Sequence, residues 1–146
     1  MNCKIEKSKL VGKITCPANK SYTHRAIFLA ALSDGKSIVK KILRSNDTIA
    51  TINACRGFGV EVDELENNVT IKNTINQTVQ NSIINAENSG TTIRIAIAIA
   101  ALSGGNTTLT GDDSLRKRPM QPILNALQTM GVKTKSDDGK PPIHIN

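Results

Sequence analysis

The fold depends on how one stretch is interpreted: residues 90–104, which read GTTIRIAIAIAALSG. Isoleucine stands at every second position from Ile93 to Ile99, and a period of two residues is typical of a β-strand. The residues between the isoleucines include alanines, which favour a helix, and the run is long for a strand. Periodicity alone therefore leaves both interpretations open.

An internal repeat favours the helix. Ala31-Leu32-Ser33 recurs as Ala101-Leu102-Ser103, 70 positions later, and Gly59-Val60 recurs as Gly131-Val132, 72 positions later. The earlier run, Ser21–Leu32, has the pattern of a helix, so its counterpart is expected to be one as well. We therefore predict an α/β (α+β) fold built from two copies of a β-α-β-α-β-β unit.

The predicted elements follow the same order in both copies, which cover roughly residues 10–73 and 83–146. In the first copy we expect a strand over 10–16, a helix over 21–32, a strand over 37–42, a helix that is capped within 44–47 and ends at Gly57, and a hairpin of 60–65 with 69–73. In the second copy we expect a strand over 83–86, a helix that ends at Leu102, a strand over 107–110, a helix opened by Arg118-Pro119, and a hairpin of 132–136 with 142–146.

Composition indicates a globular protein with an acidic partner. The 146 residues are 38% hydrophobic and 21% charged, with almost no aromatic side chains, so the core must consist of Ile, Val, Leu and Ala. The net charge of +7 suits either a nucleic acid or a small phosphorylated or carboxylated ligand. The scarcity of aromatic residues weakens the case for single-stranded nucleic acid, which stacks on such side chains.

Neither cysteine nor histidine spacing indicates a metal site. Cys3, Cys16 and Cys55 form no CxxC pair, and His24 and His144 have no partner at metal-ligand spacing. We expect reduced thiols, with Cys55 in the core. The start of the chain is too charged for a signal peptide, and no segment is apolar for long enough to cross a bilayer. The sequence thus predicts a cytoplasmic location without membrane contact.

The start of the first long helix is a candidate anion site. Ser21 is placed to cap this helix, and it shares a helical face with Arg25, as Lys20 does with His24. Free backbone N–H groups, the helix dipole and nearby cations favour a bound anion. The alternative is an ordinary helix start with solvated charges.

The repeat supplies a second helix start. Gly90-Thr91 stands 70 positions after Lys20-Ser21, so pseudo-symmetric packing would direct both helix starts towards one region, near Arg94 and Arg118. Gly90 would allow a ligand to approach the backbone, although it could equally be a flexible turn. Arg118 is either an anion ligand or a solvated charge, and Asp47 is better explained as an N-cap than as a catalytic carboxylate. The residues alone do not identify a reaction.

Three motifs resemble those of one enzyme family. Lys20–Ala26 resembles the Lys-Ser-x-x-x-Arg signature of the EPSP synthases (3-phosphoshikimate 1-carboxyvinyltransferases), and Asn88–Arg94 resembles their Asn-x-Gly-Thr-x-x-Arg segment. Leu109–Pro119 resembles their Leu-Thr-Gly…Arg-Pro segment, and Ser45–Asp47 fits their Ser-Asp/Glu-Asp segment with Asn46 in place of the first acid. The motifs occur in the family's order across the whole chain.

The resemblance implies an activity and a set of site residues. The family transfers the enolpyruvyl group of phosphoenolpyruvate to the 5-hydroxyl of shikimate 3-phosphate through a tetrahedral ketal, without a metal or organic cofactor, and the parent enzyme is expected to be a monomer. By position, Lys20 would contact both substrates as the catalytic lysine. Shikimate 3-phosphate would be bound by Lys20, Ser21 and Arg25, and phosphoenolpyruvate by Lys20, Gly90 and Arg118, with Asp47, Asn88, Thr91 and Arg94 supporting the site.

The resemblance also implies that the chain is an N-terminal fragment. The family fold has two domains, each built from three β-α-β-α-β-β units. Residues 1–16 would be a strand segment that belongs to the other domain, and residues 17–73 and 83–146 would be the first two units. The third unit, the second domain and the acid–base residues would lie outside this chain, so the chain alone is expected to be inactive.

Two related alternatives account for the sequence less well. UDP-N-acetylglucosamine enolpyruvyl transferases have Lys-Asn where this chain has Lys20-Ser21, and they carry a reactive Cys before the arginine that corresponds to Arg118. No Cys follows Cys55 here. RNA 3'-phosphate cyclases share related units, but few aromatic residues and the Lys20–Arg25 motif argue against a nucleic-acid module.

Overall fold

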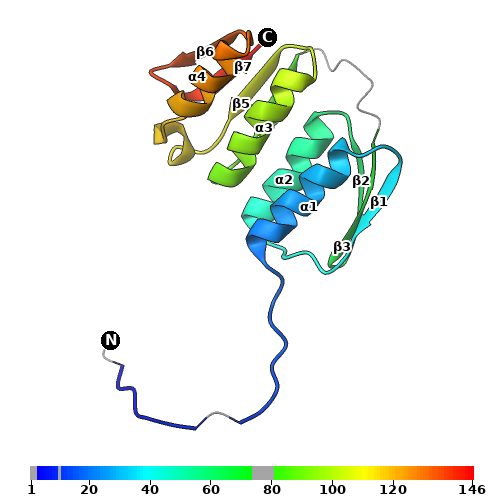
Figure 1. The fold of residues 1–146 in the computed structure, drawn as a ribbon, viewed down its shortest axis with the longest axis vertical. Coiled ribbons are helices and arrows are strands. Elements are labelled where there is room, and N and C mark those ends of the chain that lie inside the picture. Colours follow the sequence, from blue (N-terminus) through cyan, green and yellow to red (C-terminus); the bar gives the residue numbers. More distant parts are fainter. Residues whose placement is uncertain (1–2, 10, 74–80) are drawn as a thin grey trace.

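The computed structural model describes residues 3–9, 11–73 and 81–146 of this α/β chain. Figure 1 shows the helices in front of the strands, with the N-terminal segment extending away from them. The helices are α1 (Lys20–Leu32), α2 (Asn46–Gly57), α3 (Gly90–Leu102) and α4 (Gln121–Thr129).

The strands form two sheets, one in each half of the chain. The first sheet has the order β1-β3-β2, with antiparallel pairing, and consists of β1 (Lys36–Val39), β2 (Glu61–Leu65) and β3 (Asn68–Lys72). The second sheet has the order β4-β5-β7-β6 and consists of β4 (Ser82–Asn85), β5 (Thr107–Thr110), β7 (Lys140–Ile145) and β6 (Thr134–Asp137). β4 runs parallel to β5, and the other pairs are antiparallel.

The ambiguous isoleucine run is a helix, as the repeat predicts. Ile93 and Ile97 are four residues apart and wholly buried, whereas Ile95 is only partly buried. Ile99 is also buried, at 5% exposed, so three of the four isoleucines lie in the core and Ile95 lies at its margin. Local period was misleading here because Ala96, which stands between two of the isoleucines, is buried too, as in a helix and not in a half-exposed strand.

The structure confirms the internal repeat. α1 and α3 each have 13 residues, and their first residues, Lys20 and Gly90, are 70 positions apart. The strands β5, β7 and β6 repeat the order of β1, β3 and β2. A single hydrophobic cluster joins the halves, and its fully buried members include Ile27, Ile52, Ile71, Ile84, Ile97 and Leu109. The core is thus built from aliphatic residues, and Cys55 lies in it, as expected.

Two predicted elements differ from the structure. Leu10 lies outside the described residues, and residues 11–16 form no strand, because no strand within residues 3–9, 11–73 and 81–146 pairs with their backbone groups. The helix predicted to open at Arg118-Pro119 begins instead at Gln121. Before it, a short 3₁₀ turn, η1 (Leu115–Lys117), and a hydrogen bond from Met120 N to Gly139 O at 2.7 Å hold the chain in a loop.

Candidate functional site

The first part of the site is the start of α1. Asn19, not Ser21, caps this helix: its backbone is extended, and its side chain accepts a hydrogen bond from Tyr22 N at 3.0 Å. The helix therefore begins one residue earlier than predicted, and the Ser21 hydroxyl is not used for capping. Ser21 and Arg25 are exposed, and their side chains bond to no other residue in the described parts of the chain. Both are available to a ligand.

The second part is the start of α2. Ser45 caps this helix through a capping box with Thr48, so Asp47 is not the cap that the sequence suggested. Asp47 lies in the first turn, where its carboxylate accepts a hydrogen bond from Lys20 Nζ at 2.8 Å. Both side chains are partly exposed, and such a pair is worth about 1 kcal/mol or less. An incoming anion could therefore draw Lys20 away from Asp47 at little cost.

The third part is the start of α3. Ser89 caps it by accepting a hydrogen bond from Thr92 N at 3.2 Å, so Gly90 is its first residue. A methyl group on Gly90 would lie 2.9 Å from Arg94 Nη1 and 3.1 Å from Arg118 Nη1. Two guanidinium groups therefore stand directly over a backbone position that has no side chain. The structure brings Gly90, Arg94 and Arg118 together, and Thr91 is exposed beside them.

A hydrogen-bonded pair of side chains orients Arg118. Asn88 Oδ1 accepts a hydrogen bond from Arg118 Nη2, and Asn88 Nδ2 donates to Asp112 Oδ2 at 2.7 Å. Asp112 Oδ1 accepts from Leu115 N at 2.7 Å. These donors, first the Leu115 N–H and then the Asn88 amide, lower the pKa of Asp112 below its usual value, so the carboxylate stays ionised. A fixed carboxylate thus determines which way the Asn88 amide faces, and that amide positions the guanidinium.

Sequence reasoning gave Asp112 no role. The residue lies inside the Leu109–Pro119 segment. A carboxylate on a loop that also carries Arg116, Lys117 and Arg118 has, from sequence alone, no evident role beyond a charge in solvent. Only the orientation of Asn88 between Asp112 and Arg118 shows what it does. The motif itself was a usable signal, because it places an acid near the arginine that it orients.

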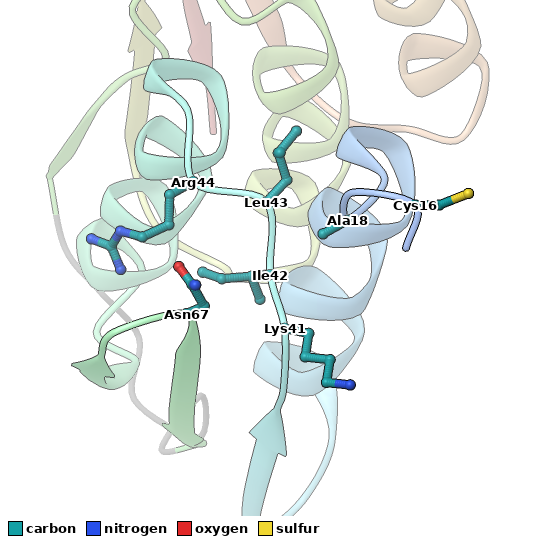
Figure 2. A pocket seen from close by; sticks show the side chains of 7 residues that line it. All are labelled: Cys16, Ala18, Lys41, Ile42, Leu43, Arg44 and Asn67. Atoms are coloured by element: carbon teal, nitrogen blue, oxygen red, sulfur yellow. The ribbon is translucent and has the colours of Figure 1, made fainter. Parts of the chain in front are cut away.

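Two larger cavities and a smaller one of about 170 Å³ lie near these helix starts, and the smaller one is lined in part by Asn19, Tyr22 and Thr23. Figure 2 shows a cavity of about 440 Å³ beside the segment that links β1 to α2, lined by Cys16, Ala18, Lys41, Ile42, Leu43, Arg44 and Asn67. None of these is a predicted site residue, and Arg44 is engaged by Glu64 and by Glu66 O. A second cavity of about 330 Å³ includes Asn88 and Asp112 together with Asn46 and Asn53 of α2. The second one adjoins the side chains that orient Arg118.

The chemistry available here is anion binding. Lys20 and Arg25 come from α1, and Arg94 and Arg118 lie at the start of α3, so the site offers cations and helix N-terminal N–H groups for two anionic groups. Within the described ranges, no group of three or more His, Cys, Asp or Glu side chains could hold a metal ion. No helix in those ranges is both long and apolar enough to cross a membrane.

Comparison with known proteins identifies relatives over nearly the whole chain. It is 54% identical over 145 residues to the 3-phosphoshikimate 1-carboxyvinyltransferase of Nitrosopumilus maritimus, covering 99% of this chain and 34% of that protein. It is 47% identical over 140 residues to the enzyme of the same name from Methanosarcina acetivorans, covering 95% and 32%. The chain therefore spans about a third of the length of these relatives.

Solved structures agree. The EPSP synthase of Acinetobacter baumannii superposes on 92% of this chain with a TM-score of 0.81 and 31% sequence identity, and the match covers 32% of that protein. The family model described as EPSP synthase (3-phosphoshikimate 1-carboxyvinyltransferase) matches residues 5–146. Three motifs, a shared fold and this match lead to one conclusion: the chain belongs to the EPSP synthase family.

Proposed function

We propose that this chain supplies about a third of an enzyme that transfers the enolpyruvyl group of phosphoenolpyruvate to the 5-hydroxyl of shikimate 3-phosphate, a step of aromatic amino-acid biosynthesis. The observation that carries the proposal is the pair of guanidinium groups, Arg94 and Arg118, over the side-chain-free backbone of Gly90. Phosphoenolpyruvate carries a phosphate and a carboxylate, and both suit bidentate guanidinium binding.

The chemistry is an addition followed by an elimination. The 5-hydroxyl oxygen bonds to C2 of phosphoenolpyruvate while C3 gains a proton, which gives a tetrahedral ketal. The C2–O bond to phosphate then breaks, C3 loses a proton, and phosphate leaves. Cations that hold the phosphate and carboxylate stabilise the negative charge that develops on the leaving phosphate. In this chain Lys20 and Arg118 are the residues we assign to that task.

Shikimate 3-phosphate would bind at the start of α1. Ser21 and Arg25 lie on one exposed face of that helix, and Lys20 begins it. The Asp47 carboxylate at 2.8 Å keeps Lys20 between the starts of α1 and α2 until a ligand is present. We propose that Lys20 contacts both substrates once it is released from Asp47.

We propose that the chain by itself binds these substrates without turning them over. The transfer requires a group that protonates C3 and one that accepts the hydroxyl proton, and we assign these to parts of the enzyme outside this chain. The partners are small anions rather than nucleic acid, and the enzyme is proposed to be a monomer. The three free cysteines fit a cytoplasmic location, where thiols stay reduced.

The test is an NMR titration of the chain with each substrate. We expect shikimate 3-phosphate to shift the amides around Lys20–Arg25 and phosphoenolpyruvate to shift those around Gly90. Arg25→Ala should weaken shikimate 3-phosphate binding, and Arg118→Ala should weaken phosphoenolpyruvate binding, each by about tenfold or more, as expected for a lost charge-assisted hydrogen bond.

Arg116→Ala is the matched control. Arg116 is an exposed arginine two positions before Arg118, but its Nε donates to Thr110 Oγ1 at 3.3 Å. This variant should retain both affinities. Equal losses in all three variants would show that net charge alone attracts the anions. Absence of any shift at millimolar ligand would reject a preformed site in this chain.

A further inference from the structure

A chain of buried polar side chains joins three helices directly beneath the candidate site. His24 Nδ1 of α1 lies 2.6 Å from Thr51 Oγ1 of α2, which lies 2.7 Å from Thr92 Oγ1 of α3. Thr92 Oγ1 donates to Ser89 Oγ, the cap of α3, at 2.7 Å. All four side chains are at most 1% exposed. Each of the three helices contributes one of these hydrogen-bonded side chains from its first two turns.

The direction of the hydrogen bonds follows from counting protons. The Thr92 hydroxyl donates its single proton to Ser89 Oγ or to Asp47 O, so with either acceptor Thr92 accepts from Thr51. The Thr51 proton is then used, and His24 Nδ1 must donate to Thr51. The arrangement therefore calls for the neutral tautomer with its proton on Nδ1, and Nε2 carries a lone pair.

The surroundings of His24 agree with that tautomer. Nε2 is buried and has no hydrogen-bond partner within the described part of the chain, so a proton there would be a buried donor without an acceptor. Burial lowers the pKa of His24, and nearby Lys20 acts in the same direction, although Asp47 opposes them. The neutral His24 ring is thus the hydrogen-bond donor to Thr51.

The hydrogen-bonded chain also touches the backbone beside Lys20. Asp47 O lies 3.4 Å from Thr51 Oγ1 and 3.3 Å from Thr92 Oγ1. The side chain of the same residue pairs with Lys20. α1 packs on α2, and α2 packs on α3, so the first turn of α2 stands between the two helix starts that carry the cations.

We propose that His24, Thr51 and Thr92 are positioning residues that hold the first turns of α1, α2 and α3 in one fixed arrangement. Resting on the function proposed above, this arrangement would set the separation between the residues for shikimate 3-phosphate on α1 and those for phosphoenolpyruvate at Gly90. The two sets come from different repeats, and small misplacements of binding groups have large effects on a reaction between two bound substrates. A buried hydrogen-bonded network that links three helices resists such displacement.

The first test needs no ligand. Thr51→Val removes the central hydroxyl, and Thr51→Ser retains it. In Thr51→Val we expect amide hydrogen exchange to rise on the order of tenfold in the first turns of both α1 and α3, as for the loss of one buried hydrogen bond. Thr51→Ser should stay close to the wild type. An effect confined to α2 would overturn the proposal.

Thr107→Val is the matched control. Thr107 is also buried, and its hydroxyl pairs with Ser82 Oγ at 3.0 Å, at the end of β4 opposite to the one that leads into α3. This variant loses an equivalent buried hydrogen bond away from the helix starts. If it increased exchange at α1 and α3 as much as Thr51→Val does, the effect would be general destabilisation, and the proposal would be wrong.

A measurement on the wild-type chain guards against a variant that does not fold. Nitrogen-15 shifts of the His24 ring should show the Nδ1–H tautomer at neutral pH, and the Nε2–H tautomer would overturn the hydrogen-bonded chain as drawn.

Titrations then address the substrates. Thr51→Val should weaken the binding of both shikimate 3-phosphate and phosphoenolpyruvate by about five- to tenfold, and Thr51→Ser should restore both affinities. If Thr51→Val bound both substrates as the wild type does, the three residues would not be positioning residues for them. If the wild-type chain bound neither substrate, the proposed function would be wrong. Amide hydrogen exchange and the nitrogen-15 shifts of the His24 ring would still show whether the hydrogen bonds hold the starts of α1, α2 and α3 together.

Discussion

The two halves of the chain follow one plan but differ at a sheet edge. In the second half β4 lies parallel to β5 and completes a four-stranded sheet, whereas in the first half β1 is an edge strand of three. The positions 70 residues before β4 are 12–15, which form no strand. Ile84 is 1% exposed, and its counterpart Ile14 is 91% exposed. Equivalent sequence positions thus have opposite environments, because a strand forms only where a partner strand offers its backbone groups.

The halves also differ in where their cations lie. In the first half Lys20 and Arg25 belong to the helix itself. In the second half the helix begins with Gly90, and Arg118 reaches it from the loop that contains η1. The repeat therefore supplies two similar helix starts that differ in the cations around them.

The strongest test of the common plan is a pair of equivalent core substitutions. Ile27 and Ile97 are 70 positions apart, and both are fully buried in the same hydrophobic cluster. Ile27→Ala and Ile97→Ala should each lower the free energy of unfolding by about 2–5 kcal/mol. Because the cluster spans both halves, circular dichroism and amide NMR should report a single shared transition in each variant. Two separate transitions would show that the halves are independent domains.

The next largest effect concerns the orientation of Arg118. Ala18 stands 70 positions before Asn88, so Asn88→Ala gives the second half the residue of the first. The guanidinium loses its acceptor on Asn88 and keeps only the longer contact of Nη2 with Ser114 Oγ at 3.5 Å, and we expect phosphoenolpyruvate affinity to fall on the order of tenfold, as for a charged hydrogen bond. Isothermal titration calorimetry measures it, and shikimate 3-phosphate affinity is the internal control. An unchanged phosphoenolpyruvate affinity would mean that Asn88 and Asp112 do not position Arg118 for binding.

A smaller effect is the pH dependence of stability that His24 causes. His24 is buried, whereas Arg94, at the equivalent position 70 residues later, is exposed. The folded-state pKa of His24 lies below its usual value, near 6.5, because of burial. As the pH falls through about 6.5, the unfolded chain therefore binds a proton before the folded chain does, and stability decreases until the folded-state pKa is passed. Urea unfolding between pH 7.5 and pH 5 measures this slope.

His24→Gln should flatten that slope, and His144→Gln is the control. His144 is half-buried and lies 3.0 Å from Thr108 Oγ1 in the second sheet. If the free energy of unfolding still depended on pH in His24→Gln but no longer did so in His144→Gln, the pH dependence would come from His144 and the prediction would be wrong.

Much of the fold could be predicted from the sequence, because the helices and hairpins repeat. The repeat identified α3 where local periodicity favoured a strand, and it placed the start of α3 correctly relative to α1. The strand over 10–16 could not be judged in this way, because pairing depends on a distant partner. The cap of α1 was predicted wrongly as Ser21: Asn19 and Ser21 are both good capping residues, and only the backbone conformation at Asn19 shows which of them is used.

The helix starts and motifs predict Lys20, Gly90 and Arg118 as site residues, and the structure brings Gly90 and Arg118 together. The side chains that support them were harder to predict. The roles of Asp112 and Thr51 depend on distances between side chains far apart in the chain, 2.7 Å from Asp112 to Asn88 and from Thr51 to Thr92. No periodicity or spacing rule contains that information.

The smallest expected effect uses thiols to sharpen the comparison at the sheet edge. Cys16 is exposed, but Ala86, 70 positions later, is fully buried at the end of β4. Iodoacetamide should label Cys16 and Cys3 quickly in the native chain and leave Cys55 unlabelled. Cys55 is buried, and burial raises its pKa to about 12, so little reactive thiolate is present.

Labelling Cys16 should change the free energy of unfolding by less than about 0.5 kcal/mol, since its side chain contributes nothing to the core. Mass spectrometry gives the sites, and urea unfolding gives the stability. Slow labelling of Cys16 would indicate that residues 12–15 pair with the free edge of β1, as β4 does with β5, and the two halves would then be alike. Fast labelling would show that residues 12–15 do not pair with β1. The second half would then have the strand that precedes its first helix, and the first half would lack it.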